Sequence, residues 1–126
     1  MVYAVDFDGT LCEDAFPEIG APRRAVIEFV KAARAAGDKV ILWTCRVDDR
    51  LEAALAWCAE QGLAFDAVND NLPELIEKYN SNCRKVCADR YIDDKAIGPF
   101  ELDMLRGLLY SRPAERPSLL FVGFAY

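Results

Sequence analysis

The stretch "VYAVDFDGT", residues 2–10, decides how the chain folds. The apolar run from Val2 to Phe7 is typical of a strand that is buried on both faces of a parallel sheet. Asp6 and Asp8 lie at its end, and the Gly-Thr pair that follows is where the strand has to stop. Two like charges at the end of a core strand do not stabilise a fold by themselves, so they indicate a turn, a metal site or a reaction.

Strands and helices alternate along the rest of the chain. Three further strands are expected, over 39–44 (KVILWT), 65–68 (FDAV) and 90–94 (RYIDD). Four helices are expected between and after them, over 23–37, 50–62, 72–79 and 99–110. This alternation indicates βαβ units and predicts an α/β fold, a three-layer Rossmann-like sandwich in which helices cover both faces of a mostly parallel sheet.

Residues that commonly start and stop helices define the expected boundaries. Pro22 suits the first turn of the first helix, and Asp48 or Asp49 suits the N-cap of the second. Gly37 and Gly62 are expected to end these two helices.

Length and charge limit the organisation and the partners. The 126 residues fit one domain, with a core over 1–110 and a tail over 111–126. The apolar end of the tail, "SLLFVGFAY", predicts an extra edge strand or, alternatively, a subunit contact in a homo-oligomer. The net charge of −6 argues against general nucleic-acid binding, which needs clustered Lys and Arg.

The sequence predicts a cytoplasmic protein without a membrane partner. It begins with a strand-like segment rather than a basic and apolar leader, and no apolar run approaches the roughly 20 residues that cross a bilayer. The five cysteines include no CxxC pair, so most are expected to be free structural thiols. The complete absence of histidine excludes a histidine general base, which leaves carboxylates, lysine, hydroxyls or a metal for any chemistry.

Several polar residues follow the expected strands, at the edge where ligands bind in open α/β sheets. They are Asp6, Asp8, Thr44, Lys85, Asp93 and Asp94. Carboxylates that meet there repel one another unless a cation lies among them, and oxygen-only donors suit Mg²⁺. A lysine and a hydroxyl beside Mg²⁺ would contact phosphate oxygens, so a phosphorylated substrate is expected.

Each of these features also has an ordinary structural explanation. Asp-Gly is a common turn pair, and an acid pair after a strand is often a solvated loop or a helix cap. Their convergence at one edge of the sheet favours the functional interpretation.

The succession of "DFDGT", "ILWT", a lysine and "YIDD" resembles the haloacid dehalogenase-like (HAD) superfamily of phosphohydrolases. The resemblance runs from Val2 to about Leu109. It implies a Mg²⁺-dependent phosphatase that works through a covalent aspartyl-phosphate. The second aspartate of the signature, Asp8, favours phosphatase over dehalogenase chemistry.

The resemblance also implies a role for each motif residue. Asp6 would be the nucleophile, and Asp8 would protonate the leaving oxygen and then activate water. Thr44 would hold a phosphoryl oxygen, together with backbone N–H groups near Cys45. Lys85 would neutralise charge on the nucleophile and the phosphoryl group.

The same resemblance implies the metal ligands. Asp93 would bind Mg²⁺ directly, and Asp94 would bind it through water or support the site from outside. Asp8 would contribute its backbone carbonyl. The complete expected metal set is Asp6, Asp8, Asp93 and Asp94.

Five residues near this edge are expected to contact the substrate: Gly9, Thr10, Cys45, Arg46 and Asn69. Arg46 can alternatively pair with Asp48 or Asp49. Asn69, like Asn71, can alternatively form a turn or cap the helix at Pro73.

No cap domain is expected. Residues 11–22 have room only for a loop or hairpin, and residues 69–82 only for one short helix. Capless family members resemble enzymes with open sites, which either act on large substrates or have one side of the site formed by another subunit. In this chain the tail over 111–126 is the segment that would form that side.

Three other functions remain open at this stage. A receiver domain also gathers acids, Thr, Lys and Mg²⁺, but its phosphorylated aspartate ends the third strand, and "FDAV" ends without an acid. A phosphotransferase would pass the phosphoryl group to an acceptor other than water. A non-catalytic regulatory module would bind Mg²⁺ and phosphate without turnover.

Overall fold

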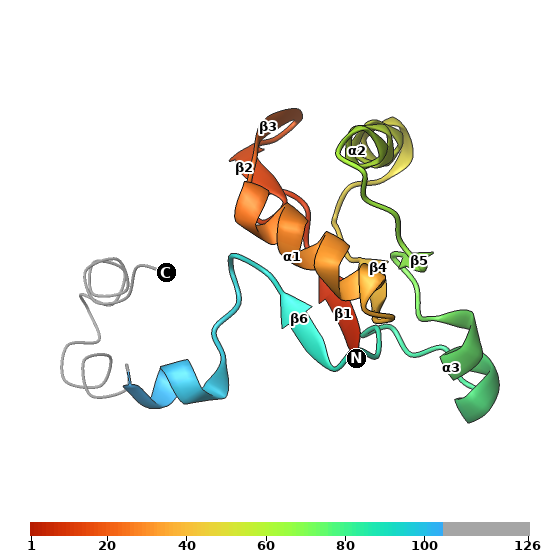
Figure 1. Ribbon diagram of the computed structural model, residues 1–126. Coiled ribbons are helices and arrows are strands. Elements are labelled where there is room, and N and C mark those ends of the chain that lie inside the picture. Colours follow the sequence, from red (N-terminus) through yellow and green to blue (C-terminus); the bar gives the residue numbers. More distant parts are fainter. Residues whose placement is uncertain (105–126) are drawn as a thin grey trace. The chain divides into compact units, whose positions relative to one another are not determined.

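A four-stranded parallel sheet forms the centre of the unit Met1–Asp94 (Figure 1). Its strand order is β5-β4-β1-β6. The strands are β1 (Val2–Val5), β4 (Lys39–Leu42), β5 (Ala67–Val68) and β6 (Arg90–Ile92). All four strands that the sequence predicts are present, each shorter than expected.

The computed structural model describes residues 1–104, and the chain divides into two compact units, Met1–Asp94 and Lys95–Tyr126. In the described part of the second unit, residues 99–104 are helical, within the helix predicted over 99–110. The tail over 111–126 lies outside the described residues, and with it the predicted edge strand or subunit contact. Within residues 1–104, no helix has both the length and the apolar character needed to cross a membrane.

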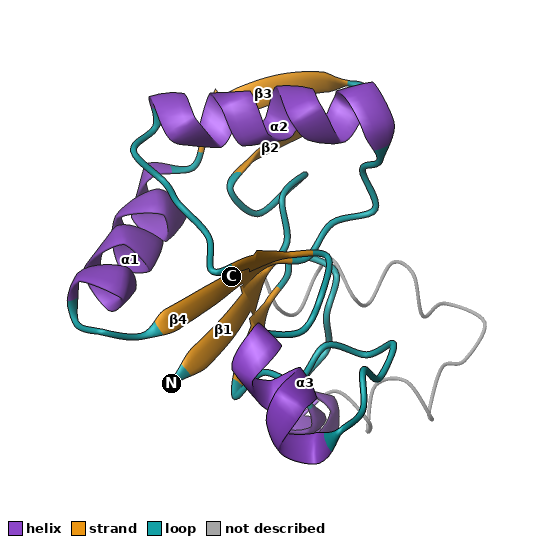
Figure 2. Cartoon of the chain, turned by 90° about the vertical axis from the view of Figure 1, so that its right-hand side faces the viewer, coloured by secondary structure: helices purple, strands orange, loops and turns teal. Residues whose placement is uncertain are grey.

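Helices pack on both faces of the sheet. Val5 and Leu42 join a core cluster with residues of α1 (Arg24–Ala35) and α2 (Asp48–Glu60). Their neighbours Ala4 and Ile41 belong to a second cluster, against which α3 (Pro73–Tyr79) packs through Leu75. Because successive strand residues point to opposite faces, the two clusters lie on opposite sides of the sheet. Figure 2 shows α2 and α3 on these two sides.

An antiparallel hairpin fills the gap after the first strand. Its strands are β2 (Cys12–Ala15) and β3 (Glu18–Pro22). The expectation that Pro22 opens the first helix is wrong, because Pro22 pairs with Cys12 at the end of the hairpin. Helix α1 begins two residues later, with Arg23 as its N-cap.

The second helix also begins differently from the prediction. Its N-cap is Val47, which makes no side-chain capping bond, and Asp48 and Asp49 lie within the first turn. Acids in the first turn still favour the helix through its dipole, but they do not cap it as predicted. Gly37 and Gly62 directly follow the C-cap residues of α1 and α2, so both predicted helix ends are confirmed.

The cysteines are free thiols. All five lie within the described residues, with Cys12 and Cys58 buried and the other three exposed. Burial raises the pKa of the Cys58 thiol to about 12, so this side chain remains a neutral core group.

Candidate active site

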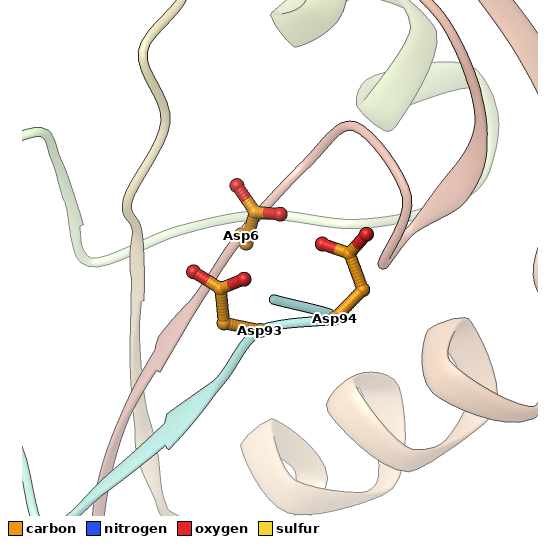
Figure 3. Close-up of side chains that lie close together, drawn as sticks. All are labelled: Asp6, Asp93 and Asp94. Carbon is orange, nitrogen blue, oxygen red and sulfur yellow. The ribbon is translucent and has the colours of Figure 1, made fainter. Parts of the chain in front are cut away.

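The carboxyl ends of β1 and β6 bring three acidic side chains together. Val5 is the register partner of Ile92, and the N–H of Asp6 donates to the carbonyl of Ile92 at 2.9 Å. The residues that follow the two strands therefore lie side by side (Figure 3). One carboxylate oxygen from each of Asp6, Asp93 and Asp94 lies within 4.8 Å of the others. The structure thus brings together three of the four predicted metal residues.

Thr10 joins two of these carboxylates. Its hydroxyl lies 3.2 Å from Oδ2 of Asp6 and 3.3 Å from Oδ1 of Asp94, and it accepts the N–H of Asp94 at 3.0 Å. A hydroxyl has one proton, so it donates to one carboxylate at a time. Thr10 is buried, so its contacts are with the acidic cluster rather than with a substrate.

Burial and like charge perturb the carboxyl group of Asp6. Burial, followed by the charge of Asp93, raises the pKa of Asp6 from 3.8 to about 7. A hydrogen bond with Asp94 raises this pKa further, whereas bonds from the Phe7 backbone and Thr10 lower it. Asp6 is therefore partly protonated at neutral pH unless a cation lies among the three carboxyl groups.

The position of Asp94 in the acidic cluster requires a glycine at residue 9. Its φ is +87°, a conformation that side chains of L residues rarely adopt, and an added Cβ would lie 2.7 Å from Cγ of Asp94. Gly9, predicted as a substrate contact, is thus the residue that leaves room for a carboxylate.

Gly9→Ala is expected to destabilise the protein by about 1–3 kcal/mol and to weaken its stabilisation by a divalent cation. The added methyl group displaces Asp94, and thermal unfolding with and without Mg²⁺ measures both effects. Gly37→Ala is the matched control, because Gly37 has a φ of +97° but no atom within 4 Å of an added Cβ. It should lose stability from strain alone and keep its response to Mg²⁺. An undiminished response in Gly9→Ala would contradict the argument.

Asp8 points to an arginine instead of the acidic cluster. Nε of Arg46 donates to Oδ2 of Asp8 at 2.8 Å, and Nη2 donates to Oδ1 at 2.7 Å. The alternative pairing of Arg46 with Asp48 or Asp49 is therefore wrong. With its side chain 1% exposed and paired in this way, Arg46 is placed as a partner of Asp8 rather than as a substrate contact.

The loop after β4 is held by an asparagine from the loop after β5. Oδ1 of Asn69 accepts the N–H of Thr44 at 2.8 Å, and the Asn69 amide lies 3.5 Å from the carbonyl of Arg46. Asn69 has a φ of +52°, in the left-handed region, at a bend in the chain, and its side chain contacts the loop after β4. The Thr44 hydroxyl accepts the N–H of Arg46 at 3.1 Å and keeps its own proton for another acceptor. Cys45 is exposed beside it.

Lys85 is not paired with Asp6 in this arrangement. Its Nζ is 5.2 Å from the ring centroid of Tyr91, on β6, and within the described residues no ion pair joins it to Asp6. Asn71 anchors the surrounding loop: its Nδ2 donates to the Cys83 carbonyl at 2.9 Å, and its Oδ1 accepts the Cys87 N–H at 2.6 Å. Asn71 was expected either to contact the substrate or to form a turn or a cap, and no local sequence signal indicates this longer-range role.

The fold and the site together define an α/β protein with a carboxylate cluster at the carboxyl edge of a parallel sheet. Among solved structures, the chain is similar to a conserved protein from Bacteroides thetaiotaomicron, with a TM-score of 0.68 and 34% sequence identity over 92% of this chain and 91% of that one. The chain belongs to the same family as this Bacteroides protein. No protein-family model matches the chain, and no curated protein matches it. This likeness indicates no activity, and the chemistry of the chain is read from the residues of its site.

Proposed function

We propose that this protein is a HAD-like, Mg²⁺-dependent phosphomonoesterase that forms an aspartyl-phosphate on Asp6. The observation that carries the proposal is the meeting of Asp6, Asp93 and Asp94 at the ends of two adjacent parallel strands. Such a cluster is costly for an apo protein, as the raised pKa of Asp6 indicates, and it gains stability when a cation binds.

The donor set fits Mg²⁺. The three residues offer only carboxylate oxygens, which hard divalent cations prefer, and the described cluster includes no sulfur or nitrogen ligand. Asp6, Asp93 and Asp94 would hold the ion. When bound, Mg²⁺ would neutralise charge on the phosphoryl group and keep Asp6 ionised.

The residues of the chain would perform two displacements. An oxygen of Asp6 forms a bond to phosphorus while the bond to the leaving oxygen breaks, and Asp8 gives that oxygen its proton. Water then attacks phosphorus, Asp8 takes a proton from it, and the bond between Asp6 and phosphorus breaks. Phosphate leaves, and both carboxyl groups return to their starting protonation.

Groups on two loops would position the phosphoryl oxygens. The Thr44 hydroxyl keeps a proton to donate, and the Cys45 N–H has no acceptor within residues 1–104. Lys85 would reach the phosphoryl group after leaving the ring of Tyr91, through rotation of its long side chain.

A capless three-layer sandwich is part of this proposal. The short hairpin β2–β3 and the single helix α3 occupy the two places where HAD-like proteins carry caps, which supports an open site. An open site suits a large phosphorylated substrate.

A phosphate-release assay tests the proposal. Sugar phosphates, nucleotides, phospholipid headgroups and phosphorylated nucleic-acid ends should be compared in the presence of Mg²⁺, with EDTA as the metal-free condition. At least one class is expected to release phosphate, and EDTA is expected to abolish the release. Mg²⁺ binding without release from any class would instead support the regulatory module.

A further inference from the structure

Arg46 is buried within the structure that surrounds Asp8. Its guanidinium lies between the rings of Phe7 and Phe16, 5.0 Å and 5.1 Å from their centroids. Nη2 donates to the Glu18 carbonyl at 2.9 Å, and Nη1 lies 3.3 Å from the Pro17 carbonyl. One arginine thus contacts the strand-end segment that carries Asp8 and the turn of the hairpin β2–β3.

The pair with Asp8 is specific in its geometry. A bidentate guanidinium–carboxylate contact fixes the orientation of both groups, and a buried cation that loses its partner is strongly destabilised. The hydrogen bond with Asp8 raises the pKa of Arg46, against the effect of burial. The carbonyls of Pro17 and Glu18, on the hairpin, accept further hydrogen bonds from the guanidinium.

This contact restricts what Asp8 does in the reaction. Nε and Nη2 of Arg46 each contact a different oxygen of Asp8, so any rotation of this carboxylate breaks at least one of the two hydrogen bonds. Arg46 therefore limits the orientations that Asp8 adopts.

We propose that Arg46 is the positioning residue of Asp8: its bidentate contact fixes the orientation of the Asp8 carboxylate, and its contacts with the Pro17 and Glu18 carbonyls couple that carboxylate to the hairpin β2–β3. The catalytic part rests on the proposed phosphatase function. The coupling to the hairpin rests on the contacts of Arg46 alone.

Steady-state kinetics test the catalytic part. Arg46→Met is expected to lower kcat about 30- to 100-fold with KM within threefold, and Arg46→Lys to recover about tenfold of that loss. In an Asp8→Asn background, Arg46→Met should lower kcat by less than a further threefold, because the positioned group is already absent. Losses that multiply in the double variant would overturn the positioning role. Circular dichroism shows whether each variant folds. If Arg46→Met does not fold, Arg46→Lys replaces it in the double-mutant cycle with Asp8→Asn.

Amide hydrogen exchange tests the coupling without activity. Asp8→Asn and Arg46→Met should each accelerate exchange over residues 12–22 at least about tenfold, and the double variant no more than either alone. Arg34→Met is the matched control, because Arg34 pairs with Asp66 through two nitrogens outside the hairpin. Unchanged hairpin exchange in Asp8→Asn would overturn the coupling. The two proposals can also fail separately. If the wild type releases no phosphate but hairpin exchange is faster in the two variants, the phosphatase proposal and the catalytic role of Arg46 are overturned and the coupling is supported.

Discussion

Asp6→Asn is expected to lower Mg²⁺-dependent phosphate release at least about a thousandfold, the loss typical of a removed nucleophile. The amide has nearly the shape of the carboxylate, so the fold should remain, but its neutral group attacks phosphorus poorly. The measurement is kcat on whichever substrate class the panel identifies, together with rapid acid quenching to detect a phosphorylated protein. The wild type should yield an acyl phosphate that hydroxylamine removes, and Asp6→Asn should yield none.

The control for this experiment is a matched change from acid to amide away from the site. Glu28→Gln, on the exposed face of α1, should keep the wild-type kcat within twofold. A phosphorylated protein that still forms in Asp6→Asn would place the covalent intermediate on another residue. Full activity without any phosphorylated protein would point to direct attack by water.

The second large effect is a dependence of stability on pH that Mg²⁺ removes. Asp6 has a pKa of about 7 in the folded protein, against its ordinary value of 3.8, so the folded state binds its proton more tightly. The stability from this proton is fully present below pH 3.8 and is lost as pH rises through 7. A shift of about three pKa units corresponds to about 4 kcal/mol, which solvent screening at this half-exposed group reduces to about 1–2 kcal/mol.

Thermal unfolding at pH 5.5 and pH 8, with and without Mg²⁺, measures this effect. The increase in Tm with Mg²⁺ is expected to be larger at pH 8, because the ion then replaces no proton on Asp6. A Mg²⁺ concentration of 100 times Kd should add about 2.7 kcal/mol. Asp6→Asn should be more stable than the wild type at pH 8 without Mg²⁺, since it removes one of the repelling charges. An equal Mg²⁺ effect at both pH values would contradict the raised pKa.

The sequence predicts the parts of the site that depend on strand order. Asp6 and Asp93 each follow an apolar strand, and parallel strands end at one edge, so their meeting needs no knowledge of side-chain geometry. The same reasoning predicts the position of Thr44. The strands, the hairpin and the helix ends at Gly37 and Gly62 follow from equally local signals.

The remaining contacts depend on the three-dimensional path of the loops. Pro22 has the sequence context of a helix start, but pairing with Cys12 places it in the hairpin. Arg46 has acids two and three residues after it, yet its partner is Asp8, which lies 38 residues away in sequence. Such pairs depend on which distant segments the folded chain brings together, and a single sequence does not reveal them.

The side chain of Asn71 holds the loop that carries Lys85, and this limits which loop sequences the fold accepts there. Residues 81–89 contain no strand or helix, and the amide of one buried side chain supplies contacts to Cys83 and Cys87 in this loop. None of these contacts involves a strand of the sheet. A loop of different composition can therefore replace it only if it returns one carbonyl and one N–H to Asn71 and also keeps Lys85, the buried side chain of Val86 and the contacts of Asp89 with Val2. Such a replacement leaves the residues of the acidic cluster unchanged.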